Sequence, residues 1–224
     1  MAHSARQHLR LDNDAYDQAI RRFIPGYERM LSVAADAVAA VEPELVLDVG
    51  AGTGALSEVV LERSGVGTVE LLDIDPEMIA QARQRLSNFG ARARFTLRSF
   101  DEPLTASDAV AASLSLHHIP TLEAKAAFYA RVFRALRPGG VLVNADVNMP
   151  PASTERDRLY RYWADHLVAN GIAEERAWQH FDEWSEEDTY LPREAESRQL
   201  ERVGFEVECI WSDGPVGVVV AKKT

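Results

Sequence analysis

Apolar residues recur along this chain in two patterns, as short runs of β-forming residues and as stripes at helical spacing. The stripes fill the intervals between successive runs, and the stripe after the fourth run is expected to extend from Leu122 to a turn at Arg137–Gly140. Strands that alternate with helices in this way predict a parallel sheet covered on both faces. The runs that predict strands are Leu45–Val49, Thr68–Leu72, Ala93–Leu97, Ser107–Leu114 and Val141–Val147.

Two segments interrupt this alternation. Residues 1–43 contain two helical stripes before the first strand, and residues 148–190 contain a pair of long helices with aromatic stripes after the fifth. Both segments neighbour the carboxyl edge of the sheet, where open α/β sheets bind ligands, so we expect them to form a lid. Tyr16, Phe23 and Tyr27 are the candidate lid residues.

The end of the chain predicts a hairpin. A helix over Pro192–Arg202 is followed by apolar runs at Glu206–Ser212 and Val216–Lys222, separated only by Asp213–Pro215. A turn this short permits only antiparallel pairing of the two strands.

Composition narrows the class of protein. The chain has 224 residues, of which 46% are hydrophobic, so residues 1–224 suffice for a single domain with a buried core. No apolar run is long enough to span a bilayer and the first residues lack the apolar core of a signal peptide, so a cytoplasmic location is expected. Cys209, the single cysteine, excludes an internal disulfide and is expected to be a buried strand residue.

Charge bears on the partners. A formal net charge of −11 and a pI near 5.0 work against binding to nucleic acid or to an anionic membrane. A small-molecule partner fits better. The sequence leaves the oligomeric state open, with a homodimer as one outcome.

A glycine-rich turn between the first strand and the next helix indicates a ligand site. Gly50, Gly52 and Gly54 lack Cβ atoms, so the turn can adopt positive φ and a flat ligand can approach its backbone. Asp73 follows the second strand, nineteen residues after Gly54, where a carboxylate can accept the hydroxyls of a ribose. Gly50, Gly52 and Ala55 also fit the fingerprint of NAD sites, so this turn alone does not choose the cofactor.

Further motifs, taken in order, resemble those of class I S-adenosylmethionine (SAM)-dependent methyltransferases. They are Asp48–Gly54, Leu72–Met78, Phe100–Asp101, Ser113–Ile119 and Leu136–Gly140. The resemblance implies a Rossmann-like three-layer α/β fold with strand order 3-2-1-4-5-7-6 and an antiparallel strand 7, SAM as cofactor and S-adenosylhomocysteine (SAH) as product. It assigns methionine contacts to Gly50, Ala51, Gly52 and Gly54, ribose contacts to Asp73 and Ile74, adenine contacts to Phe100, Asp101 and Glu102, and positions beneath the cofactor to Ser113 and Leu114.

A second resemblance links the N-terminal segment and the 148–190 insert to carboxy-SAM synthases. Ile24–Tyr27 and the segment from Gly204 to Trp211 are similar to theirs, which implies a cofactor contact for Tyr27. The intact glycine pattern weighs against that activity. So does Gln199, which stands where those enzymes carry a carboxylate-binding arginine and cannot supply its cationic fork.

We therefore expect an enzyme that transfers a methyl group from SAM to a small molecule. His117 is the candidate general base, because it follows the fourth strand at the edge of the cleft and its imidazole titrates in the useful range. No tight spacing of ligand residues supports a metal site. The alternatives are a carboxy-SAM synthase, a SAM-binding regulatory protein without turnover, and an NAD-dependent dehydrogenase.

Overall fold

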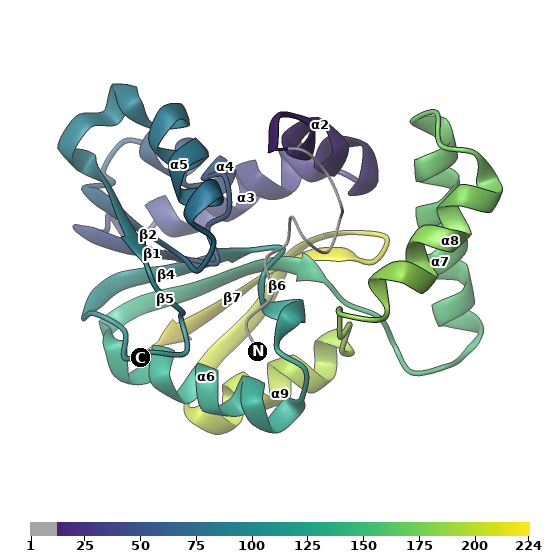
Figure 1. Cartoon of the computed structure of the whole chain (residues 1–224). Helices are drawn as coiled ribbons and strands as arrows, with labels where there is room; N and C mark the ends of the chain where they lie inside the picture. The colour runs from purple at the N-terminus through teal and green to yellow at the C-terminus, as the bar shows by residue number, and fades with distance from the viewer. Residues whose placement is uncertain (1–12) are drawn as a thin grey trace.

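The strands form one mixed sheet. The computed structural model describes residues 13–224, with side chains from Asp17 onward, so Tyr16 lies outside the described side chains (Figure 1). The seven-stranded sheet has the order β3-β2-β1-β4-β5-β7-β6, and β7 is antiparallel to both β5 and β6. The expected Rossmann-like order and the terminal hairpin are confirmed.

The strands are β1 (Leu45–Val49), β2 (Thr68–Asp73), β3 (Ala93–Leu97), β4 (Ser107–Ser113), β5 (Leu136–Val147), β6 (Phe205–Asp213) and β7 (Val216–Lys223). The α-helices are α2 (Asn13–Phe23), α3 (Tyr27–Ala39), α4 (Ala55–Leu61), α5 (Pro76–Arg85), α6 (Leu122–Ala135), α7 (Thr154–Ala169), α8 (Glu174–Trp184) and α9 (Arg193–Val203). Two 3-10 helices, η1 (Ser87–Arg92) and η2 (Leu116–His118), complete the described elements.

The sheet has a core on each face. Helices α3, α4 and α5 cover one face, and α6 and α9 cover the other (Figure 1). Successive residues of a strand point to opposite faces, so Val46 belongs to the first core and Leu47 to the second. Burial on both faces explains why apolar residues occupy successive positions of β1, with Asp48 as the exception, rather than every second position.

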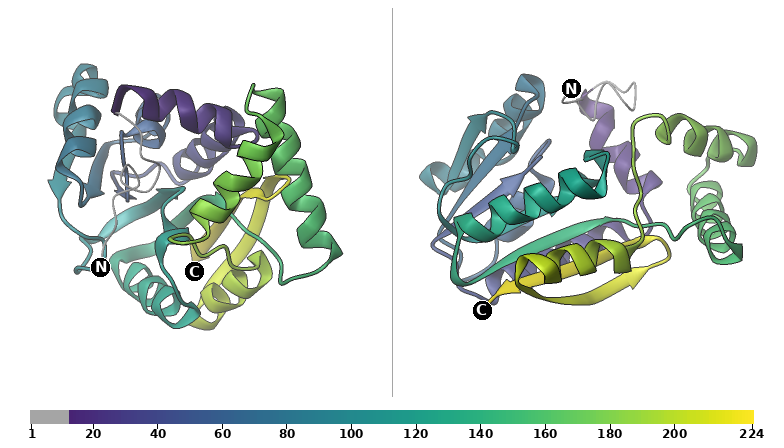
Figure 2. Two further views of the ribbon diagram at one scale, coloured as in Figure 1. Left: turned by 45° about the vertical axis from the view of Figure 1, so that its right-hand side comes forward. Right: turned by 90° about the horizontal axis from the view of Figure 1, so that it is seen from below.

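Helices α7 and α8 follow β5 in the chain and extend beyond its carboxyl end (Figure 2). They pack against the N-terminal helices through aromatic residues, and Nε1 of Trp163 donates a hydrogen bond of 2.6 Å to the carbonyl of Phe23. The ring of Phe23 lies 5.4 Å from that of Trp184. The N-terminal segment and the insert, which are far apart in the sequence, therefore meet beside the carboxyl edge of the sheet.

Two details differ from expectation. Strand β5 begins at Leu136 rather than at Val141, and α6 ends at Ala135. Pro138 is the cause, because it disfavours a helical conformation at the residue before it. The expectation of a buried Cys209 is wrong, because β6 is an edge strand and this side chain is exposed. None of the helices formed by residues 13–224 has the length and apolar character that crossing a bilayer requires.

Candidate functional site

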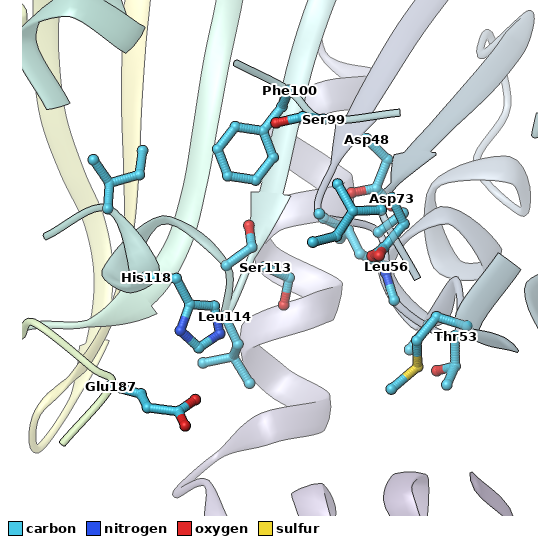
Figure 3. Close-up of a pocket in the computed structure, with 18 of the residues that line it drawn as sticks. Asp48, Thr53, Leu56, Asp73, Ser99, Phe100, Ser113, Leu114, His118 and Glu187 are labelled. Atoms are coloured by element: carbon cyan, nitrogen blue, oxygen red, sulfur yellow. Dashed lines mark hydrogen bonds between the residues drawn. The ribbon is translucent and has the colours of Figure 1, made fainter. Parts of the chain in front are cut away.

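A cavity of about 470 Å³ opens at the carboxyl ends of β1, β2 and β4 (Figure 3). The glycine turn and Asp73 form one part of its wall, and Ser113, Leu114 and His118 form another. Residues from α2, α3 and the loop after α8 also line it, among them Ile20, Tyr27 and Glu187. Strands, lid helices and insert thus all contribute to one cavity.

Each glycine of the turn has a different role. Gly50 has a φ of 66°, and a Cβ there would lie 2.6 Å from Cβ of Ser115, so no side chain fits. Gly52 has a φ of 54° and open space where its Cβ would be, which leaves its backbone facing the cavity. Gly54 caps α4 and packs against Leu71, so it is not among the residues that line the cavity.

Two carboxylates lie behind this turn. Asp73 accepts hydrogen bonds from the backbone N–H groups of Gly52, at 2.8 Å, and of Asp75, at 2.9 Å. Burial raises the pKa of Asp73 more than these bonds lower it. Asp48 accepts a bond of 2.6 Å from the Ser57 hydroxyl, and burial, aided by the charge of Asp73, raises its pKa to about 7. This pair favours a cationic or hydrogen-bond-donating ligand.

The other predicted nucleoside contacts divide between cavity and solvent. Ile74 and Phe100 line the cavity, and the Phe100 ring packs edge-on against Phe128 at 5.4 Å. Asp101 also lines it, although 72% of its side chain is exposed and Oδ1 accepts a bond of 3.0 Å from Arg131. Glu102 is exposed and is not among the residues that line the cavity, so the structure places it apart from the others.

The predicted lid residues have different environments. Tyr27 lines the cavity together with Ala51, whereas Phe23 packs into the aromatic contact with the insert. Helix α2 is tied to the glycine turn, because Oγ1 of Thr53 donates to Asp17 at 2.7 Å and Asp17 also pairs with Arg85. The lid therefore rests on the turn it covers.

The two adjacent histidines of η2 differ in position. His117 is buried, is not among the residues that line the cavity, and directs Nδ1 to Oδ1 of Asp146 at 2.6 Å. His118 lines the cavity, and its Nδ1 lies 3.1 Å from Oδ1 of Asp188 (Figure 3). The same Asp188 oxygen lies 3.6 Å from Nε2 of His117.

Their electrostatic environments differ as well. Burial alone would lower the pKa of His117, but the charges of Asp146 and Asp188 outweigh it and raise the pKa to about 9. Burial, followed by the charge of His117, lowers the pKa of His118 below its ordinary value of 6.5. At neutral pH His117 is therefore charged and His118 is not.

Comparison with known proteins agrees with this architecture. Residues 46–140 match the family described as a methyltransferase domain. The structure superposes with a TM-score of 0.66 on that of a SAM-bound amino pentose methyltransferase from Micromonospora echinaspora, over 94% of this chain and 97% of the other at 21% identity. The chain has the class I methyltransferase fold.

Curated relatives point to the same family. An uncharacterized methyltransferase of Geobacillus kaustophilus is 32% identical over 135 residues, which are 59% of each protein, so this chain spans about three-fifths of that relative. A carboxy-SAM synthase of Aeromonas salmonicida is 27% identical over 169 residues, which are 72% of this chain and 68% of the synthase.

Several residues in and beside this cavity are not marked by any sequence motif discussed above. Ser115 supports Gly50 and donates to the carbonyl of Val49 at 2.9 Å. His118 lines the cavity although the sequence favours His117, because sequence does not show which of two successive residues a one-turn helix directs into a cavity. Glu187 and Asp188 lie in a loop without a motif, far along the chain from β4.

Proposed function

We propose that this protein is a SAM-dependent methyltransferase that acts on a small molecule. The main support is the cavity over the glycine turn, in a fold that matches that of a SAM-bound methyltransferase over nearly the whole length of both chains. We refer to Gly50–Gly52, Asp73, Ile74 and Phe100 as the cofactor half of the cavity. His118, Ile119 and Glu187 form its acceptor half, and Ser113 and Leu114 lie between the two.

The cofactor half offers a suitable group for each part of SAM. The Asp73 carboxylate is the proposed acceptor for the ribose hydroxyls, and Phe100 with Asp101 provides a ring and an acceptor for adenine. The bare backbone at Gly52 and the acidic pair behind it suit the cationic methionine end. Tyr27, Ser113 and Leu114 complete the proposed set, and Gly54 supports it by allowing α4 to pack closely.

A small acceptor fits the enclosure. Ile20 and Tyr27 bring α2 and α3 to the cavity, and Glu187 brings the insert. Methyl transfer is an in-line displacement at a carbon that the sulfonium activates, so the protein must mainly align the nucleophile and exclude water. We propose that the N-terminal helices and the insert do this as a lid.

Carboxy-SAM synthesis is the second candidate, because a carboxy-SAM synthase is among the relatives. A carboxylate-bearing co-substrate needs a cationic partner. None of the described residues that line the cavity is Lys or Arg, and Arg198, beside Gln199 on α9, is exposed. Methyl transfer is therefore the better supported of the two.

Calorimetry with SAH and a transfer assay test the proposal. The protein should bind SAH, and it should move label from [methyl-³H]SAM into the low-mass fraction of a cell extract. The absence of SAH binding would rule the proposal out. Binding without transfer would indicate a regulatory protein, and mass-spectrometric detection of carboxylated cofactor after incubation with SAM and prephenate would favour the synthase.

A further inference from the structure

The loop that follows α8 packs against both residues of the His117–His118 pair. The N–H of Thr189 donates a hydrogen bond of 2.9 Å to the carbonyl of His117, which ties the loop to η2. Asp188, whose side chain is 4% exposed, directs Oδ1 toward both histidines and accepts a bond of 2.5 Å from the Tyr190 hydroxyl at Oδ2. A buried carboxylate is thus fixed beside the His118 ring, and it is not among the residues that line the cavity.

We propose that His118, rather than His117, accepts the proton of the acceptor during methyl transfer, and that Asp188 positions its imidazole for this step. This inference rests on the proposed methyltransferase function. Nδ1 of His118 is turned to Asp188, so Nε2 is the nitrogen that this ring presents to the acceptor half. A carboxylate that holds one ring nitrogen fixes the tautomer and leaves a lone pair on the other.

His117 is not placed for this step. Nδ1 points to Asp146 at 2.6 Å and Nε2 points toward Asp188 at 3.6 Å, so both ring nitrogens are directed at carboxylates. The backbone N–H of His117 also donates to Asp146, at 3.0 Å. His117 is therefore a positioning residue that joins Asp146 to Asp188.

The charged and titratable groups around His118 come from three elements. His117 lies on the same η2 turn, with ring centroids 4.2 Å apart, Asp146 lies on β5, and Asp188 lies in the loop after α8. Glu187 of that loop lines the cavity with His118 (Figure 3). Burial and the charge of His117 lower the pKa of His118 by more than Asp188 and Asp146 raise it. His118 is therefore unprotonated at neutral pH, the state that a general base requires.

The proposed step balances charge and atoms. The acceptor heteroatom, which carries a proton, attacks the methyl carbon of SAM, and the carbon–sulfur bond breaks with its electron pair moving to sulfur. The products are the methylated acceptor and neutral SAH. The heteroatom proton moves to Nε2 of His118, so the positive charge of the sulfonium passes to an imidazolium beside Asp188, and solvent later takes the proton.

The same donor atoms also raise the question of a metal ion. One ligand atom from each of His117, His118 and Asp188 can lie within 4.8 Å of the others. The arrangement favours a proton over a metal, because His117 faces two carboxylates, with Nδ1 2.6 Å from Asp146 and Nε2 3.6 Å from Asp188. Tight binding of one zinc ion that is lost in His118→Gln would overturn the proposal.

Ring nitrogen NMR tests the positioning without any acceptor. In ¹⁵N-histidine-labelled protein bound to SAH at pH 7, His118 should be neutral with its proton on Nδ1, and His117 should carry protons on both nitrogens. Assignments come from His117→Gln and His118→Gln. Asp188→Asn should release the tautomer, giving His118 a share of the Nε2–H form. A His118 that is charged, or protonated on Nε2, in the wild-type protein would contradict the proposal.

Label transfer from [methyl-³H]SAM to the low-mass extract fraction tests the chemistry. His118→Gln should slow transfer about 100-fold, in line with the usual contribution of a general base, and leave SAH affinity within about twofold of wild type. Asp188→Asn should lower kcat more than it changes KM and shift the acidic limb of the pH profile. His166→Gln, on α7 outside the cavity lining, is the matched control. An undiminished rate of transfer by His118→Gln would refute the role of His118 as the base. The absence of SAH binding by the wild-type protein would instead refute the proposed function.

Discussion

The cofactor half and the acceptor half of the cavity are built in different ways. In the cofactor half the decisive features are backbone, since Gly50 and Gly52 adopt positive φ and Asp73 binds the N–H of Gly52. In and behind the acceptor half they are titratable side chains, because His118 lies against Asp188 and His117 against Asp146. The cofactor half depends on positions that carry no side chain, whereas the acceptor half depends on titratable side chains.

This difference predicts how each half responds to change. A backbone cradle tolerates no added atoms where it approaches a neighbour, and the glycine turn itself carries no titratable side chain. A network of histidines and carboxylates tolerates changes of shape and responds to protonation.

Gly50→Ala should be the most damaging change in the cofactor half. The new Cβ would lie 2.6 Å from Cβ of Ser115, at a φ of 66°. Backbone strain and overpacking together should lower the free energy of unfolding by about 3 to 4 kcal/mol, or the melting temperature by roughly 10 °C. Thermal unfolding followed by circular dichroism measures this.

Gly52→Ala is the matched control, because its φ of 54° is similar and its Cβ would meet nothing within 4 Å. It should cost only the backbone term of about 1 to 2 kcal/mol. Equal destabilisation by the two substitutions would show that conformation alone, and not contact with Ser115, requires the glycine.

His117, which lies behind the acceptor half, should make the stability of the protein depend on pH. Because its pKa is about 9 in the folded protein and 6.5 otherwise, its contribution is fully present below pH 6.5 and is lost as pH rises through 9. The advantage of the wild-type protein over His117→Gln should therefore shrink by about 3 kcal/mol between pH 6 and pH 10. Urea unfolding of both proteins measures it, and a pH-independent difference would mean that His117 is not charged in the folded protein.

The two halves also differ in how far sequence predicted them. The glycine turn and Asp73 are separated by one helix and one strand, so a short stretch of sequence specifies their relation. Along the sequence, β5, α7 and α8 all lie between His118 and Asp188. Their contact therefore depends on how the insert folds back against η2. Glu102 was predicted in the site but is exposed, because the backbone turns at Ser99, whose carbonyl accepts a bond of 3.3 Å from the N–H of Glu102.

The fold itself followed from hydrophobic pattern and motif order. The strand order and the hairpin are confirmed. Exposure was harder to predict, as Cys209 shows, because sequence does not reveal which apolar residues of an edge strand face solvent.

Asp73→Asn should separate the halves by affinity. The substitution removes a buried negative charge and places an amide NH₂ against the N–H of Gly52 or of Asp75. SAH should bind about 30-fold more weakly, as expected for losing a charged hydrogen-bond acceptor worth about 2 kcal/mol. Calorimetry compares it with His118→Gln, which lies in the other half and should keep its affinity within about twofold. A comparable loss in both variants would show that the halves are not independent.

The smallest effect should come from the rim of the cofactor half, where Asp101 and Glu102 are adjacent carboxylates in different positions. Asp101 lines the cavity with a side chain that is 72% exposed, so solvent should screen its proposed contact with adenine. Asp101→Asn should therefore weaken SAH binding only about twofold to threefold, corresponding to roughly 0.5 kcal/mol. Glu102→Gln carries the same change of charge outside the cavity lining and should leave SAH affinity unchanged in the same calorimetric titration. Equal weakening by both would trace the effect to the loss of a negative charge at the rim rather than to contact with adenine, and a loss confined to Glu102→Gln would mean that the chain after Phe100 turns inward when the nucleoside binds.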